Sequence, residues 1–342
     1  MSEAGVQAYE DALASLTHQA PAALAHWGIA PRSLQLVKFR ENAVYRVEAQ
    51  DGTRFALRFH RCGYHSDAAL RSELRWMSAL QEAGIDVPRV VPAMDGRLFI
   101  SICAEGFGGP LQVDLFEWID GRPLGTSEEG VGGDAAQVED LYRTLGGMSA
   151  RLHNQATEWP LPPGFTRHHW DAEGLVGEQP FWGRFWELAA LTPDERTLVV
   201  AARDCVRREL SAFAASVDPG TCYSLIHADF VPENLLLAQG KVRLLDFDDA
   251  GFGWHLFDLA TALWFIQDDE HYEAAREALV AGYREFRALP DDLLARLPVF
   301  MMARGFTYLG WVHTRPGSRE AAALTPYLVR LACRFAERLL HA

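Results

Sequence analysis

The sequence predicts an α+β fold of two lobes, in which a small antiparallel β-sheet lobe precedes a larger, mainly helical lobe. The first third alternates short apolar segments with turn residues and leaves room for one amphipathic helix. Amphipathic helical patterns fill most of the remainder, and one compact β segment interrupts them. At 342 residues the chain also exceeds the length at which a single hydrophobic core keeps growing, which favours two units over one.

Turn and capping signals define the elements of the first third. Asp51-Gly52 predicts a tight hairpin between two strands. Ser66 is expected to cap a helix that runs to about Ala83 and ends at Gly84. The other expected elements are an N-terminal helix that ends near residues 28–31 and strands at 34–39, 43–48, 54–59, 87–91, 98–102 and 112–115.

The strand pattern gives way to helices at residues 117–123, Glu-Trp-Ile-Asp-Gly-Arg-Pro. We therefore expect an N-terminal lobe over residues 1–116, a hinge over 117–123 and a C-terminal lobe over 124–342. Asp258 lies in an apolar helical segment and is expected to cap that helix or to hydrogen-bond back to the loop that begins at His227. The elements expected in the C-terminal lobe are helices at 134–154, 193–215, 272–287 and 291–341, a β region at 223–247, and loops at 125–133 and 251–253.

Composition excludes some function classes. A net charge of −14 argues against a general nucleic-acid binder or a polybasic membrane-surface protein, because both need positive charge to meet phosphate. Five scattered cysteines without Cys-x-x-Cys spacing indicate reduced thiols. No apolar run approaches the ~18 residues of a membrane span, and the N-terminus lacks a signal-peptide pattern. A cytoplasmic protein with no membrane partner is expected.

One segment of the C-terminal lobe carries the most specific set of polar residues. An apolar strand ends at His227, Asp229 follows in a loop, and Asn234 stands five residues later. The next turn closes a hairpin whose open end is expected to bring Asn234 opposite Asp246. An amide oxygen and a carboxylate are ligands that suit Mg²⁺. Asp229 would orient an acceptor hydroxyl and accept its proton. The alternative is that these residues only form turns and caps.

The N-terminal lobe carries residues suited to a nucleotide. Ala56 and Arg58 share one face of an expected strand, where a small residue leaves room for adenine and a cation can meet phosphate. Glu73 falls on the apolar face of its helix, where an unpaired carboxylate would be costly, so Arg58 is its expected partner. The alternative is a half-exposed Glu73 and a surface Arg58. Arg40-Glu41-Asn42 lies at a turn where a phosphate-covering loop would sit, and Asn42 is a candidate contact.

Two sets of residues rich in aromatic side chains are consistent either with the lining of an acceptor pocket or with packing within the fold. Arg304, Tyr308 and Trp311 share one face of an expected helix. The other group comprises Trp170, Phe181, Trp182, Phe185 and Trp186.

A family resemblance rests on these residues. Arg58, Glu73, His227-x-Asp229, Asn234, Asp246 and Asp258-Leu-Ala together resemble the aminoglycoside phosphotransferase and choline kinase-like superfamily, whose members are relatives of the protein kinases. Glu41-Asn42-x-Val44-Tyr45 and Leu57-Arg58-Phe59 are more similar to its branch of stress-response kinase and type II homoserine kinases. The resemblance spans about residues 34–262 and implies a bilobal protein kinase-like fold.

The resemblance also implies a role for each matching residue. Asp229 is implied as the catalytic aspartate, and Asn234 and Asp246 as ligands of Mg²⁺. Arg58 and Glu73 are implied as the ion pair that binds ATP. The backbone from Glu117 to Ile119 is implied as the hinge segment that binds adenine.

Three positions depart from the family pattern. Ala228 stands where the family usually has glycine. Arg58 stands where kinases in general use lysine, but the chain has only two lysines, Lys38 and Lys241, among 32 basic residues, and arginine keeps the charge. Asp246-Phe-Asp-Asp lacks the glycine of the protein-kinase Asp-Phe-Gly motif, so no activation-loop switch is implied.

The favoured function is transfer of the γ-phosphoryl group of ATP to a hydroxyl of a small molecule, such as an amino alcohol, an amino acid like homoserine, or an aminoglycoside. One alternative is a protein Ser/Thr kinase of the stress-response type. Another is a catalytically silent nucleotide-binding module, against which the intact Asp229, Asn234 and Asp246 argue.

Overall fold

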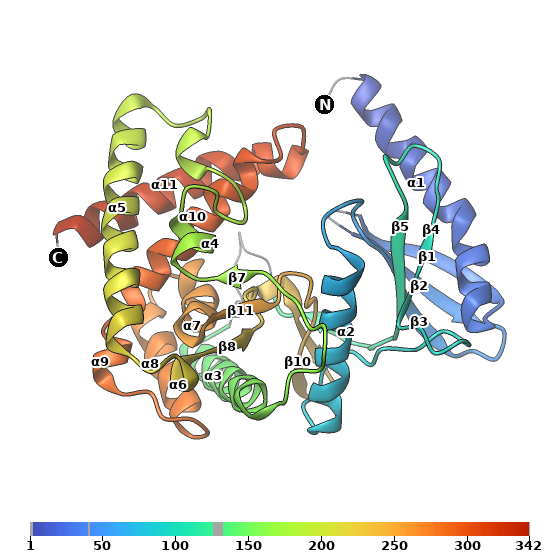
Figure 1. Cartoon of the computed structure of the whole chain (residues 1–342), viewed down its shortest axis with the longest axis horizontal. Coiled ribbons are helices and arrows are strands. Elements are labelled where there is room, and N and C mark those ends of the chain that lie inside the picture. The colour runs from blue at the N-terminus through green and yellow to red at the C-terminus, as the bar shows by residue number, and fades with distance from the viewer. Residues whose placement is uncertain (1–2, 40–41, 126–132, 342) are drawn as a thin grey trace. The chain divides into compact units, whose positions relative to one another are not determined.

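The computed structural model describes residues 3–39, 42–125 and 133–341, so most of the loop expected at 125–133 lies outside the described residues. The chain divides into two compact units (Figure 1). The first comprises residues 1–121 and 161–166, and the second comprises residues 122–160 and 167–342.

The first unit contains a five-stranded antiparallel sheet with strand order β1-β2-β3-β5-β4. Apolar side chains of the N-terminal helix, including Leu16 and Leu24, pack with Tyr45 and Phe59 into a buried core against this sheet. The elements are α1 (Glu3–Leu24), η1 (Ala25–Trp27), β1 (Pro31–Phe39), β2 (Ala43–Ala49), β3 (Arg54–Phe59), α2 (Asp67–Glu82), β4 (Phe99–Ile102) and β5 (Leu111–Glu117).

The local signals of the first unit are confirmed with one exception. Ser66 caps α2, and its hydroxyl accepts a hydrogen bond from the Ala69 N–H at 3.2 Å. The strand expected at 87–91 is wrong, because only an isolated bridge between Val90 and Phe116 forms there. Pro88 and Pro92 lack the N–H groups that a strand ladder needs.

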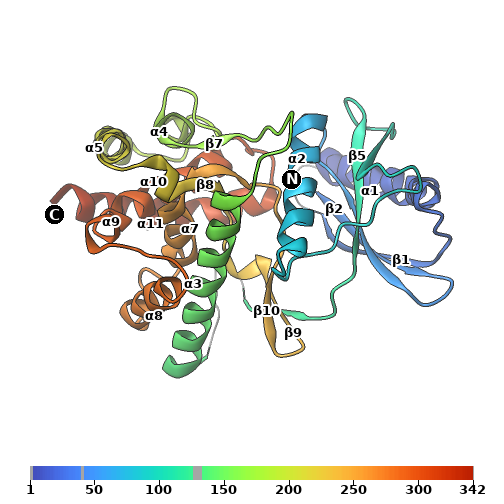
Figure 2. The same cartoon turned by 60° about the horizontal axis from the view of Figure 1, so that its bottom comes forward.

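The second unit is mainly helical and holds two small sheets, with strand orders β10-β9-β6 and β7-β11-β8. Figure 2 shows β9 and β10 as the arms of one hairpin. The helices are α3 (Ala135–Glu158), α4 (Ala172–Val176), η2 (Phe185–Glu187), α5 (Pro193–Ser216), α6 (Pro219–Cys222), η3 (Pro232–Asn234), α7 (His255–Trp264), α8 (Tyr272–Arg284), α9 (Asp291–Leu294), α10 (Leu297–His313) and α11 (Arg319–His341). The strands are β6 (Arg122–Pro123), β7 (His169–Trp170), β8 (Tyr223–Ile226), β9 (Leu235–Ala238), β10 (Lys241–Leu244) and β11 (Gly251–Trp254).

The loop expected at 251–253 is wrong, because these residues form the central strand β11 of the second small sheet. The two glycines of this segment favoured a loop, since glycine is depleted in strands. In the structure, both glycines lie where neighbouring residues approach too closely for a side chain. A Cβ atom on Gly253 would lie 2.3 Å from Cδ1 of Ile226, and one on Gly251 would lie 2.7 Å from the His168 carbonyl oxygen.

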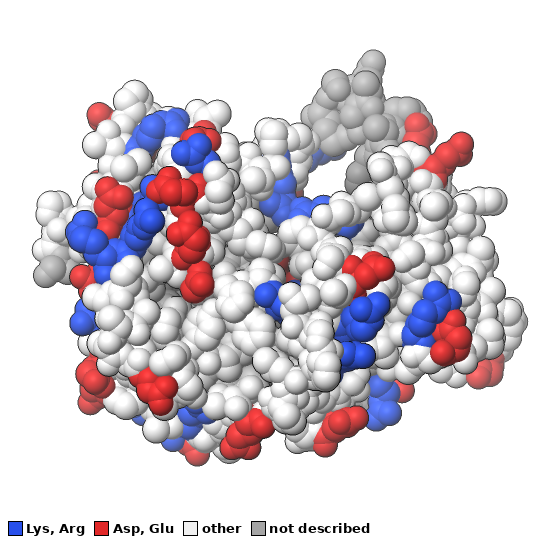
Figure 3. Space-filling model, in the orientation of Figure 1, with Lys and Arg blue, Asp and Glu red and all other residues white. Residues whose placement is uncertain are grey.

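Charged side chains of both signs are intermixed on the face shown in Figure 3. Ion pairs beside α5 illustrate the mixture, since Arg203 and Arg207 lie 2.8 and 3.0 Å from the carboxylate of Glu178. None of the described helices is both long enough and apolar enough to cross a lipid bilayer.

Candidate active site

The β9–β10 hairpin places two of the expected site residues. Its arms pair from Ala238 with Lys241 to Leu235 with Leu244. Gln239 and Gly240 both have positive φ, 53° and 74°, as a tight two-residue turn requires. The turn fixes the register of the two arms, and the register sets which polar residues face each other at the open end of the hairpin.

The register corrects one expectation. Leu245 N–H donates to the Asn234 carbonyl at 2.8 Å, so Leu245 lies opposite Asn234. Asp246 comes one residue later, and the expected direct pairing of Asn234 with Asp246 is wrong. Asp246 has a φ of 61°, so its backbone adopts the left-handed conformation immediately after the ladder. Such a conformation costs a non-glycine residue about 1–3 kcal/mol and recurs at functional sites.

Asp229 is held from two sides. Arg304 of α10 donates from Nη2 to Oδ1 of Asp229 at 2.7 Å. Asn234 donates from Nδ2 to Oδ2 at 2.6 Å and to the Asp229 carbonyl at 3.1 Å. The Asp229 side chain remains 20% exposed, whereas that of Arg304 is fully buried. Asp229 is therefore a fixed carboxylate with access to solvent.

Burial raises the pKa of Asp229 above its ordinary value. The attraction of Arg304 lowers the pKa, while the neighbouring charges of Asp246 and Glu233 raise it further. Asp246 thus lies close enough to Asp229 for the two carboxylates to repel each other. A second negative charge beside Asp229 is what a bound cation would neutralise.

His227 supports the loop as a neutral imidazole. Its Nε2 lies 3.0 Å from the Leu245 carbonyl oxygen, which can only accept, so Nε2 carries the hydrogen. Nδ1 accepts from the Asp229 N–H at 3.1 Å. Burial lowers the pKa of His227, in agreement with the neutral form. The side chain links the end of β10 to the backbone of Asp229.

Asp258 anchors the same loop from α7. Its two carboxylate oxygens accept from the N–H groups of His227 at 3.0 Å and Ala228 at 2.6 Å. The expected hydrogen bond to the loop is confirmed, whereas the expected helix cap is wrong, since Asp258 lies inside α7. His153 of α3 adds a contact that sequence reasoning missed, with Nε2 at 3.0 Å from Asp258 Oδ2.

A pH dependence of stability follows from Asp258. Burial raises its pKa from 3.8 to about 6, so the folded state binds this proton more tightly than the unfolded state does. The stabilisation is present below the unfolded-state pKa and is lost as the pH rises through the folded-state pKa. Relative to Asp258→Asn, the wild-type free energy of unfolding is expected to fall by up to about 3 kcal/mol between about pH 4 and 7. Urea unfolding of both proteins across this range measures the difference, and a difference independent of pH would contradict the assignment.

Ala228 shows why its position favours glycine. It has a φ of 63°, in the left-handed region that L-residues with a Cβ atom adopt at a cost of about 1–2 kcal/mol. The Asp258 carboxylate and Arg304, which donates from Nη1 to the Ala228 carbonyl at 3.1 Å, hold this conformation. Tertiary hydrogen bonds therefore impose the turn that glycine would adopt without strain.

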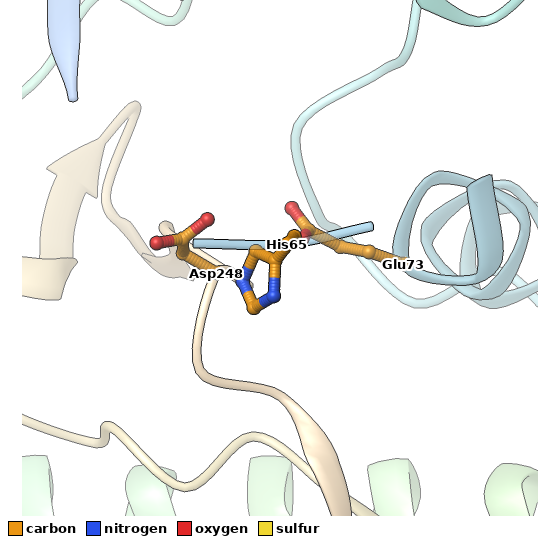
Figure 4. Close-up of side chains that lie close together, drawn as sticks. All are labelled: His65, Glu73 and Asp248. Atoms are coloured by element: carbon orange, nitrogen blue, oxygen red, sulfur yellow. The ribbon is translucent and has the colours of Figure 1, made fainter. Parts of the chain in front are cut away.

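In the first unit, Arg58 of β3 lies among buried acidic side chains. It donates from Nη2 to Glu73 at 2.8 Å, which confirms the expected ion pair, and Figure 4 shows Glu73 projecting from α2. It also donates from Nε and Nη2 to both oxygens of Asp114 on β5, at 3.0 and 2.7 Å. Glu73 and Asp114 have fully buried side chains and that of Arg58 is 7% exposed, so the alternative of surface side chains is wrong.

Asp114 was missed by sequence reasoning, although a signal was present. A carboxylate between the buried Val113 and Leu115 must find partners or remain neutral. Burial alone would raise the pKa of Asp114, but the attraction of Arg58 and His60 outweighs it and holds the pKa below its ordinary value. His60 Nε2 lies 2.9 Å from the Asp114 carboxylate.

The other expected nucleotide contacts also lie in the first unit. Asn42 is buried and its Oδ1 accepts from the Arg61 N–H at 3.0 Å, while Arg40 and Glu41 lie outside the described residues. Glu117 ends β5 with its side chain 57% exposed, and Ile119 is half-buried two residues later. The contact of these residues with a nucleotide stays a prediction.

Comparison with known proteins identifies the family. Residues 34–293 match the model of the phosphotransferase enzyme family. The chain belongs to this family. The sequence-based predictions of the family and of the enzyme class are thereby confirmed.

The relatives of this phosphotransferase include kinases of small molecules. The solved structure of the microcompartment-associated aminopropanol kinase is 34% identical, with a TM-score of 0.82 over 95% of this chain and 98% of that chain. The amicoumacin kinase of Bacillus subtilis is 24% identical over 85% of this chain and 83% of its own length. A structure of amicoumacin kinase hAmiN in complex with AMP-PNP, Ca²⁺ and Ami is 22% identical, with a TM-score of 0.75 over 99% and 96% of the two chains. These likenesses confirm the predicted kinase-like fold.

Proposed function

We propose that this phosphotransferase moves the γ-phosphoryl group of ATP to a hydroxyl of a small amino alcohol or hydroxyl-bearing amino acid. The observation that carries the proposal is Asp229, a partly exposed carboxylate held by Arg304 and Asn234 beside the charge of Asp246. The acceptor class is supported by the likeness to the aminopropanol kinase over 95% of this chain.

Asp229 acts as the base. The acceptor oxygen attacks the γ-phosphorus as its proton passes to the Asp229 carboxylate, and the bond from the γ-phosphorus to the bridging oxygen breaks to release ADP. Each carboxylate oxygen of Asp229 takes one hydrogen bond from a neighbouring side chain. A carboxylate oxygen can accept two, so capacity remains for the acceptor hydroxyl.

Asn234 and Asp246 hold the divalent cation, which we propose to be Mg²⁺. Asn234 uses its Nδ2 on Asp229, so the oxygen of its amide is the atom left for a cation. An amide oxygen and a carboxylate are hard donors that fit Mg²⁺. The cation supplies neutralisation of charge on the β- and γ-phosphates.

The first unit binds the nucleotide through Arg58, Glu73 and Asn42, with the backbone of Glu117 to Ile119 contacting adenine. Support comes from the buried ion pair of Arg58 with Glu73 and from the second carboxylate, Asp114, which fixes the plane of the guanidinium. A planar cation held in this way is oriented before a phosphate arrives.

The proposal is tested by acceptor-dependent release of ADP from Mg²⁺-ATP. The acceptors are 1-amino-2-propanol, homoserine, an aminoglycoside and a Ser/Thr-containing protein, and phosphorus NMR identifies the product. We expect a phosphate monoester of an amino alcohol or an amino acid. Phosphorylation of the protein alone, or no acceptor-dependent ADP at all, would refute the proposed acceptor class.

Asp246→Asn is expected to raise the Mg²⁺ concentration for half-maximal activity by about tenfold or more, since the affinity of such sites follows the charge of their ligands. A titration of activity with Mg²⁺ at fixed ATP measures the shift. Asp218→Asn is the matched control, because that carboxylate caps α6 through the Gly220 N–H at 2.9 Å. An equal shift of the half-maximal Mg²⁺ concentration in both variants would show that Asp246 is not a ligand of the cation.

A further inference from the structure

We propose that Arg304 is a positioning residue, which fixes the orientation of the Asp229 carboxylate and of the loop that carries it. This inference rests on the proposed role of Asp229 as the base. Arg304 lies in the middle of α10, some 75 residues beyond the loop in sequence, and nothing in the spacing of the catalytic motif indicates it.

The guanidinium of Arg304 bridges two consecutive residues of the loop. Its Nη1 donates to the Ala228 carbonyl at 3.1 Å, and its Nη2 donates to Oδ1 of Asp229 at 2.7 Å. One bond holds the backbone and the other holds the side chain. Because the two nitrogens belong to one rigid plane, the Asp229 carboxylate cannot rotate without losing a bond to a buried cation.

Aromatic rings keep this guanidinium in place. Its central carbon lies 4.1 Å from the ring centre of Tyr308, 5.3 Å from that of Trp182 and 5.8 Å from that of Phe257. Tyr308 also accepts from Nη2 at 2.6 Å. The aromatic residues for which sequence analysis left two roles open thus include two that hold Arg304 against the catalytic loop.

Close packing fixes the helix that carries Arg304. A Cβ atom on the adjacent Gly305 would lie 2.4 Å from Cη2 of Trp264 in α7, so only glycine allows α10 to approach α7 this closely. The same helix α7 carries Asp258, which accepts from the N–H groups of His227 and Ala228. Two packed helices therefore hold the loop, one through its N–H groups and the other through a carbonyl and the Asp229 side chain.

A buried arginine elsewhere in the same unit provides a contrast. Arg203 of α5 uses Nε and Nη2 on the carbonyls of Val176 and Gly177, at 2.9 and 2.7 Å, and stacks 3.9 Å over Trp186. Within the described residues, Nε of Arg304 has no hydrogen-bond partner, although the group is buried. Arg203 ties backbone segments together, whereas the terminal nitrogens of Arg304 are directed at the catalytic loop and Tyr308.

The test compares Arg304→Ala and Arg304→Lys with Arg203→Ala as the control. Misplacing a catalytic group by about 1 Å can cost about 10²-fold, so we expect Arg304→Ala to lower kcat by about that factor while the KM for ATP changes little. Arg304→Lys is expected to recover only part of kcat, because an ammonium lacks the planar fork. Added guanidinium ion should restore activity in Arg304→Ala and have no such effect in Arg203→Ala.

Two results would overturn the inference. One is full kcat in a folded Arg304→Ala protein. The other is a parallel loss of kcat, ATP affinity and stability in the Arg304 and Arg203 variants without rescue by guanidinium. If Arg304→Ala does not fold, the kcat of Arg304→Lys tests the inference instead, because lysine keeps a positive charge at this buried position. Asp229→Asn separates the two proposals. Full activity of the Asp229→Asn protein would refute the role of Asp229 as the base. An inactive Asp229→Asn protein together with a fully active Arg304→Ala protein would refute only the positioning role of Arg304.

Discussion

Asp229→Asn is expected to lower kcat by about 10²- to 10⁴-fold, the range that a general base typically contributes. Asparagine keeps the size of the side chain and can still accept from Arg304, but it cannot take the proton of the acceptor hydroxyl. Nucleotide binding should persist, because the residues proposed to contact ATP lie in the first unit. Single-turnover kinetics and the ATP dissociation constant measure the two effects separately.

Glu233→Gln is the matched control for this experiment. It removes one negative charge from the same loop, from a residue whose charge raises the pKa of Asp229. We expect kcat within a few-fold of the wild type. If Asp229→Asn folds, binds ATP and turns over at the wild-type rate, Asp229 is not the base.

Asp114→Ala is expected to lower the free energy of unfolding of the first unit by about 3–5 kcal/mol, the usual result of removing one partner from a buried ion pair. Arg58 would lose two of its hydrogen bonds and keep Glu73. His60 would lose its contact as well. Urea unfolding followed by hydrogen exchange of the β3 and β5 amides reports on this unit.

Asp120→Ala is the control for Asp114→Ala. Asp120 pairs with Arg54, which lies on the same strand as Arg58, but this pair is exposed at 36% and 60% of the two side chains. Exposed pairs contribute about 0–1 kcal/mol, so the control should change stability little. Equal losses of the free energy of unfolding in the two variants would mean that the buried Arg58 network stabilises the first unit no more than an exposed ion pair does.

Local signals predicted the loop that carries Asp229 and the hairpin that follows it. His227, Asp229 and Asn234 lie within eight residues, and Asp246 follows across a tight turn, so short-range geometry suffices to bring them together. The one-residue error at Asp246 arose because register depends on where the turn is centred. Gln239 and Gly240 form the turn, and the pairing follows from them.

The Arg58–Glu73 pair was predictable because an apolar helical face cannot hold an unpaired carboxylate. The role of Asp114 as a partner of Arg58 was not predicted, because the two residues are brought together by the long-range pairing of β3 with β5. The strand at Gly251–Trp254 was missed for a related reason, since its glycines are required by contacts with residues far away in sequence.

By itself, the sequence determined the α+β class, the loop and hairpin that carry the candidate site residues, and the ion pair of β3 with α2, because each depends on local periodicity or on spacing within one supersecondary unit. The resemblance of its motifs indicated the phosphotransferase family. Tertiary structure alone decided the partners that come from distant elements. Asp114 of β5 completes the Arg58 network, and Arg304 of α10 holds Asp229. For Asp258 of α7, the structure chose between the two roles that the sequence left open. Such partners depend on helix and strand packing over tens of residues, which no local pattern in one chain encodes.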